Sequence, residues 1–139
     1  MTVVRKDAYS YSSEVINLGA SDNANDSINI QADSDFIIHK LTFFAIDNGQ
    51  ATAAQQTDST RIIPPVLVQI TDQGSGRQIF QDAMPIPNIF GTGSLPFILP
   101  SPRRVASNSV LAINYTNLST TVAYDIYLSF IGIKVYVGR

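Results

Sequence analysis

The last part of the chain alternates between apolar and polar residues with a period of two. Residues 121–137 read TVAYDIYLSFIGIKVYV, and every even position from Val122 to Phe130 is apolar. This is the pattern of a strand with one buried face. After Gly132 the apolar residues fall on odd positions, so we expect a bulge or bend at this glycine that keeps the apolar side inward. We predict that this stretch is the central strand of the fold.

Seven further segments have the alternation or the composition of strands. The segment 36–47 is apolar on both faces, which places it centrally or buries its outer face under a loop or another subunit. All seven prolines fall between residues 64 and 102, where they forbid a long helix. The sequence therefore predicts an all-β fold, an eight-stranded antiparallel β-sandwich of jelly-roll type. Its seven other strands are expected at 9–18 (an edge strand), 27–32, 36–47, 66–72 and 77–81 (a hairpin), 95–99 and 109–117.

Composition limits the classes of partner. We expect one domain, residues 9–139, preceded by an N-terminal arm, residues 1–8. Charged residues make up only 14% of the chain, which suits either a surface that contacts partners or a surface of uncharged polar side chains. The net charge of −2 offers no basic field, so we expect neither nucleic acid nor membrane as a partner. No apolar segment resembles a signal peptide, and we expect synthesis in a cytoplasm.

Residues that carry chemistry are sparse. His39 is the only histidine and is interpreted as a packed or interface residue, because no serine stands in a nucleophile-elbow motif. The four aspartates Asp22, Asp26, Asp33 and Asp35 are interpreted as turn-capping residues, with a calcium site as the alternative, since their spacing does not match an EF-hand. We therefore expect no catalytic residue, no metal and no cofactor, and a protein that is not an enzyme.

Two groups of residues are candidates for contacts with other proteins. Adjacent arginines between a Pro-Ser-Pro segment and a strand can bind carboxylates, although two solvated loop arginines would look the same. Tyrosines on the first strand suit an interface or a sandwich rim. The predicted partner-binding residues are Tyr9, Tyr11, Arg103 and Arg104, and the predicted oligomer interface on the 36–47 strand is Ile37, His39, Leu41 and Phe43.

The order of three segments resembles a known group of proteins. They are PPVLVQITDQGSGRQIF, PIPNIFGTGSLPFILPSPRRV and SVLAINYTNLSTTVAYDIYLSFIGIKVY, and over roughly residues 27–137 the chain is similar to jelly-roll cement or decoration proteins of short-tailed bacteriophages. The resemblance implies a homo-oligomer, a dimer or trimer, that is assembled in the host cytoplasm and binds the major capsid protein on the outer capsid surface of the virion. The arm and the loop 48–60 would suit capsid contacts. The alternative is a receptor- or glycan-binding module of a phage fibre or another minor virion component.

Overall fold

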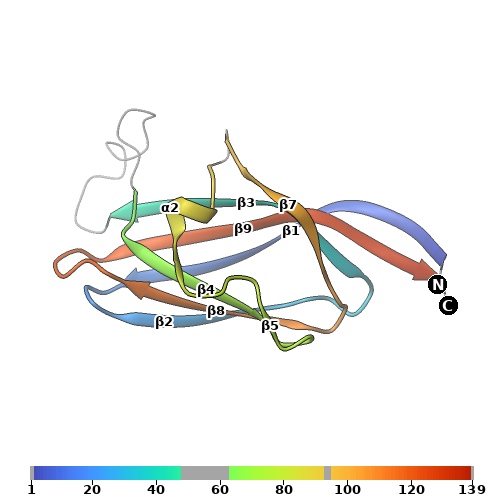
Figure 1. Ribbon diagram of the computed structural model, residues 1–139, viewed down its shortest axis with the longest axis horizontal. Coiled ribbons are helices and arrows are strands. Elements are labelled where there is room, and N and C mark those ends of the chain that lie inside the picture. The colour runs from blue at the N-terminus through green and yellow to red at the C-terminus, as the bar shows by residue number, and fades with distance from the viewer. Residues whose placement is uncertain (1, 48–62, 93–94, 139) are drawn as a thin grey trace.

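The chain folds into two antiparallel sheets that face each other (Figure 1). The computed structural model describes residues 2–47, 63–92 and 95–138. One sheet has the order β1-β9-β3-β7, and the other has the order β2-β8-β4-β5, with β6 also paired to β4. The elements are β1 (Thr2–Leu18), β2 (Asn23–Asn29), β3 (Asp35–Asp47), β4 (Val66–Asp72), β5 (Arg77–Gln78), β6 (Met84–Pro85), helix α2 (Ile86–Ile89), β7 (Phe97–Val105), β8 (Val110–Asn117) and β9 (Tyr124–Gly138).

The prediction of an all-β, two-sheet sandwich is confirmed, but the number of strands is wrong. The described residues contain nine strands where eight were expected. The additional strand is β6, a pair of residues in a segment that its prolines and glycines marked as a loop, and it forms because Met84 and Pro85 lie opposite Val68 and Leu67 of β4. The loop 48–60, predicted to suit capsid contacts, lies outside the described residues.

The closing strand β9 is central, as its alternation predicts. It pairs with β1 along one side and with β3 along the other. Its even residues Tyr124, Ile126, Leu128 and Phe130 are buried. They point toward the second sheet because successive side chains of a strand alternate between its faces.

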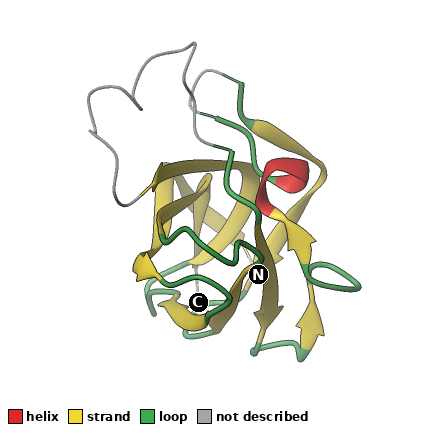
Figure 2. Ribbon diagram, turned by 90° about the vertical axis from the view of Figure 1, so that its left-hand side faces the viewer, coloured by secondary structure: helices red, strands yellow, loops and turns green. Residues whose placement is uncertain are grey.

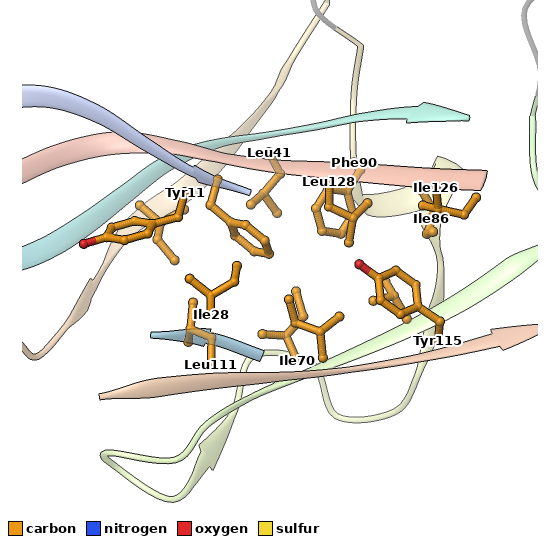
Figure 3. Packing of buried hydrophobic residues seen from close by; sticks show 14 of the residues in the cluster. Tyr11, Ile28, Leu41, Ile70, Ile86, Phe90, Leu111, Tyr115, Ile126 and Leu128 are labelled. Carbon is orange, nitrogen blue, oxygen red and sulfur yellow. The ribbon is translucent and has the colours of Figure 1, made fainter. Parts of the chain in front are cut away.

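Side chains from the two sheets meet in one core (Figure 3). Leu111, Ile113 and Tyr115 of β8 are fully buried and face the even residues of β9. The segment after β6 fills one side of the sandwich, where the Phe90 ring packs edge-on against Phe130 at a centroid distance of 5.9 Å. Helix α2 lies at this side of the two layers (Figure 2). Each such fully buried side chain contributes about 1.5–3 kcal/mol to stability.

The opposite side of the sandwich is closed by a hydrogen-bonded chain between β1 and β2. The hydroxyl of Ser13 donates to a carboxylate oxygen of Asp26 at 2.6 Å and lies 2.6 Å from the hydroxyl oxygen of Tyr115. Because the Ser13 proton is used for Asp26, Tyr115 is the donor to Ser13. Burial raises the pKa of Tyr115, so this phenol keeps its proton through the ordinary pH range.

The predicted bulge at Gly132 is wrong in its position. The pairing of β9 with β1 is regular through Gly132, and the irregularity lies in β3, where Ile38 pairs with Gly132 and Lys40 pairs with Ile131. His39 is therefore the inserted residue of the bulge. Gly132 instead allows a close approach of strands, because a Cβ there would lie 2.9 Å from the carbonyl carbon of Ile37.

The N-terminal residues predicted as a separate arm belong to β1. Thr2 pairs with Gly138, and the pairing continues with one irregularity through Arg5 and Tyr136. β1 and β9 thus form a two-stranded ribbon that extends beyond the sandwich, with both termini at its tip (Figure 1). The guanidinium of Arg5 lies 4.2 Å above the ring of Tyr136, and its Nε is 3.2 Å from the carboxylate of Asp7. These contacts and the ladder explain why the segment is a strand.

Strand β7 replaces the short strand and the connection predicted after residue 95. It is the edge strand of its sheet, and it includes Pro100 and Pro102. Prolines are tolerated there because an edge strand leaves one row of N–H groups unpaired. Arg103 and Arg104 are therefore strand residues, opposite Ile38 and Ile37 of β3.

Candidate interaction surface

The bulge at His39 separates the residues predicted as an oligomer interface. Before the bulge, Ile38 points inward and Ile37 points outward; after it, Leu41 and Phe43 point inward. Leu41 is 2% exposed, and Phe43 is partly buried and packs against the core, so both side chains face the other sheet. The prediction that these two side chains share a face with Ile37 is wrong, because one inserted residue exchanges the faces of a strand. Ile37 remains on the outer face, and the buried Nε2 of His39 has no hydrogen-bond partner in the described part of the chain.

Several outward residues of β3, β7 and β9 are apolar and lie opposite one another on neighbouring strands. Phe44 lies opposite Tyr127, with the rings 5.9 Å apart, and Ile37 lies opposite Ile133. Side chains directly opposite each other on paired strands have Cβ atoms about 5 Å apart, so these rows touch. We call this surface the outer apolar face; it consists of Ile37, Phe44, Ile98, Tyr127, Ile131 and Ile133.

Two side chains of the outer apolar face are strongly exposed. Ile98 is 65% exposed and Phe44 is 46% exposed. Lys40 stands between Ile98 and Ile131 in register, so a cation interrupts the apolar rows. Exposed aliphatic and aromatic side chains mixed with a charged residue are compatible with a protein–protein interface.

Arg104 borders the outer apolar face and has a partner within the chain. Its Nη2 and Nε donate to one carboxylate oxygen of Asp35 at 2.7 and 3.0 Å, while the N–H of Ser107 donates to the other oxygen at 2.9 Å. Partial burial raises the pKa of Asp35, but the N–H of Ser107 and the Arg104 guanidinium outweigh this effect, and the pKa lies below its ordinary value. Arg104 is thus held in place on the sheet edge.

The two tyrosines predicted to bind a partner differ in exposure. Tyr11 is 8% exposed, packs edge-on against Phe36 and accepts a hydrogen bond from the N–H of Gln31, so it is a core residue. Tyr9 is 36% exposed and lies under the ammonium of Lys134, which is 4.1 Å from the ring centroid. Of the predicted partner-binding residues, Tyr9 and Arg104 are therefore exposed, Arg103 is partly exposed and Tyr11 is buried.

Lys134 is a buried cation on β9 that is paired with polar and acidic side chains. It is 4% exposed, donates to the side-chain oxygen of Gln31 and lies 3.5 Å from a carboxylate oxygen of Asp33. Burial lowers the pKa of Lys134, but the charge of Asp33 and the neighbouring tyrosines outweigh this effect. The pKa therefore lies above its ordinary value, and the ammonium form is favoured. The sequence pattern predicted that the odd residues after Gly132 face inward, so it missed this role of the even residue Lys134.

The four aspartates considered as a calcium site have separate partners. Asp22 accepts the N–H of Asn23, and Asp26, Asp33 and Asp35 contact Ser13, Lys134 and Arg104 respectively. Within residues 2–47, 63–92 and 95–138 no group of three or more histidine, cysteine or acidic side chains is arranged to hold a metal ion. No helix in the described part of the chain is long and apolar enough to cross a membrane.

Comparisons with family models, with curated proteins and with solved structures found no match to this chain. The candidate site therefore rests on the geometry of the outer apolar face. The sequence of β3 contains a signal for this face. The inward residues have even numbers before the bulge (36 and 38) and odd numbers after it (41, 43 and 45). Sequence reasoning interpreted this change as a strand that is apolar on both sides.

Proposed function

We propose that this protein is a structural component of a phage virion, a cement or decoration protein that binds the major capsid protein on the outer surface of the shell. The observation that supports this proposal is the outer apolar face, which offers Phe44 and Ile98 for burial against a partner. The resemblance over residues 27–137 suggests which partner this is. Burial of an apolar side chain contributes about 1.5–3 kcal/mol, so a few such residues suffice for a specific contact.

We also infer a jelly-roll connectivity. The strand orders β1-β9-β3-β7 and β2-β8-β4-β5 support it, because the first and last strands are neighbours and each sheet combines strands from both halves of the chain. Such a sandwich is rigid, since each long strand is held by distant parts of the sequence. Rigidity suits a protein that ties neighbouring capsomers together.

The proposed assembly is a homo-oligomer, a dimer or trimer, present in many copies on the shell in the infected host's cytoplasm and in the finished virion. Each contact then needs only modest affinity, because the linked copies bind with avidity. The β1–β9 ribbon projects from the sandwich and is positioned to reach a neighbouring molecule (Figure 1).

The test is sedimentation of the purified protein with and without capsid shells that lack it, after mass measurement of its oligomeric state. We expect stoichiometric co-sedimentation at many copies per shell. Phe44→Asp and Ile98→Asp should each weaken binding about 10- to 100-fold, since each loses the burial of one apolar side chain. Leu118→Asp is the matched control, because Leu118 is also 54% exposed but lies outside the outer apolar face.

A protein that remains a stable oligomer but ignores shells would contradict the proposal. It would favour the receptor- or glycan-binding module of a fibre, which should instead gain thermal stability with a sugar or receptor. Equal loss of shell binding in the Leu118→Asp control would show that the outer apolar face is not the contact surface.

A further inference from the structure

A cavity of about 440 Å³ opens between the two sheets on the side where β7 and β5 are the edge strands. Its apolar part is contributed by both sheets, and its charged part consists of arginines. The apolar lining includes Ile38, Leu41, Ile70, Ile79, Leu99 and Phe130, and the arginines are Arg77, Arg103 and Arg104. A cavity that combines apolar side chains with a few converging polar groups is the usual form of a small-ligand site.

The cavity exists because β7 separates from β3 in the middle of its length. Arg103 pairs with Ile38 and Ile98 pairs with Lys40, so residues 99–102 of β7 lie opposite the single residue His39. Two of these four residues are prolines, which have no N–H for the ladder. The chain bows away from the sheet here, and Figure 1 shows β7 bending from the upper sheet toward β5.

Two of the three arginines have no anionic partner in the described part of the chain. Arg104 is paired with Asp35, whereas Arg77 and Arg103 make no ion pair with a described residue. The Nε of Arg103 is buried and donates no hydrogen bond there. A buried donor without an acceptor is costly, so an acceptor supplied by a ligand would be bound strongly.

The local charge favours a single negative group. Asp72 is 4% exposed and lies opposite Arg77 in the β4–β5 hairpin, with one carboxylate oxygen accepting the N–H of Gly74. Asp72 and Asp35 offset two of the three arginine charges, which leaves one positive charge at the cavity. A polyanion such as a polyphosphate would exceed it, whereas one carboxylate matches it.

We propose that this cavity binds a carboxylate that carries a compact apolar group. The carboxylate accepts hydrogen bonds from the guanidinium groups of Arg103 and Arg77, and the apolar group lies against Ile79 and Leu99, the partly exposed apolar residues of the lining. Such a ligand has two sources, a free small carboxylic acid or the apolar C-terminal residue of another protein chain. The inference does not depend on binding to a capsid.

The test is calorimetric titration of the full-length protein with octanoate. We expect saturable one-site binding, at least about 10-fold tighter than for octanol, which lacks the charge, or acetate, which lacks the chain. Arg103→Gln and Arg77→Gln should each weaken octanoate about 10- to 100-fold, the range for loss of a hydrogen bond to a charged group. Arg5→Gln is the matched control, because Arg5 lies in the β1–β9 ribbon and pairs with Asp7.

A second titration distinguishes the sources. The probe is N-acetyl-Leu-Phe with a free carboxylate. If it binds more tightly than octanoate and its C-terminal amide does not bind, the site is assigned to a protein C-terminus. If only octanoate binds, the site is assigned to a small acid. Saturation by neither probe, or saturation that both substitutions leave unchanged, overturns the proposal. If Arg103→Gln does not fold, Arg77→Gln still tests the proposal, because Arg77 is exposed and its replacement is not expected to unfold the protein. Shell binding measured on the same variants separates failure of this site from failure of the capsid proposal.

Discussion

Replacement of Gly132 by alanine tests the close approach between β9 and β3. A Cβ at this position would lie 2.9 Å from the carbonyl carbon of Ile37 and 3.1 Å from the Cα of Ile38, and its nearest neighbour is the Ile37 carbonyl oxygen. These atoms belong to the backbone of β3, which is paired with β9 on one side and β7 on the other. No side-chain rotation can relieve the overlap, so the strands themselves must move.

The expected cost follows from two opposing effects. Overpacking of a well-packed region costs about 1–3 kcal/mol, and the upper end applies because backbone must shift. The backbone of Gly132 is not left-handed, so alanine also restricts the unfolded chain and returns about 0.4–1 kcal/mol. We expect a net loss of about 2 kcal/mol in the free energy of unfolding, which lowers the melting temperature by about 6–10 °C for a chain of this size.

The assay is urea unfolding of Gly132→Ala beside Gly19→Ala. In the control the added Cβ would meet its nearest atom, a carboxylate oxygen of Asp22, at an ordinary 3.5 Å, and we expect unchanged stability or a gain of up to about 1 kcal/mol. The urea midpoint of Gly132→Ala should fall at an unchanged slope. Equal midpoints for the two variants would refute the reasoning, because β3 would then yield to a methyl group without cost.

Two further predictions concern ionisable groups. Tyr115→Phe removes the hydrogen bond to Ser13 and should cost about 1–2 kcal/mol in urea unfolding. Because the pKa of Tyr115 is raised in the folded protein, wild-type stability is intact below the unfolded-state pKa near 10 and falls as pH rises above it; Tyr115→Phe should show a shallower fall, and an identical alkaline profile would contradict this. Because the pKa of Asp35 is lowered, its contribution is present above the ordinary value of 3.8 and is lost as pH falls through the folded-state pKa. Asp35→Asn should therefore be less stable at pH 7, where it loses the Arg104 pair, and should lose less stability than wild type on acidification below pH 4, which pH-dependent melting would measure.

Strands with regular alternation could be predicted from the sequence. The even residues of β9 face the core without interruption as far as Phe130, so one period-two pattern specified both the strand and its buried face. The hairpin strand Val66–Asp72 has its predicted bounds, because Gly74 and Gly76 supply a turn directly after it. Local pattern and turn chemistry point to the same structure in these segments.

Features that depend on a neighbouring strand could not be predicted. A bulge is defined by two residues facing one on the partner, and the sequence of β3 alone fits either a two-sided strand or a bulged one. The pairing of β3 with β9 places the insertion at His39, which is neither a glycine nor a proline. Pro100 and Pro102 similarly indicated a connection, since their tolerance in a strand depends on that strand lying at an edge.

The bulge at His39 accounts for both surfaces proposed to bind other molecules. It turns Leu41 inward and Phe44 outward, which creates part of the outer apolar face, and at the same position β7 leaves β3 and opens the cavity. The two surfaces lie on opposite faces of one sheet and meet at its β7 edge, where Arg104 borders the outer apolar face and also lines the cavity. They are connected through β7, which carries Arg103 at the cavity and Ile98 on the outer apolar face. Measuring octanoate affinity with and without a partner on the outer apolar face tests this connection, because thermodynamic linkage requires any coupling between the two sites to be the same in both directions.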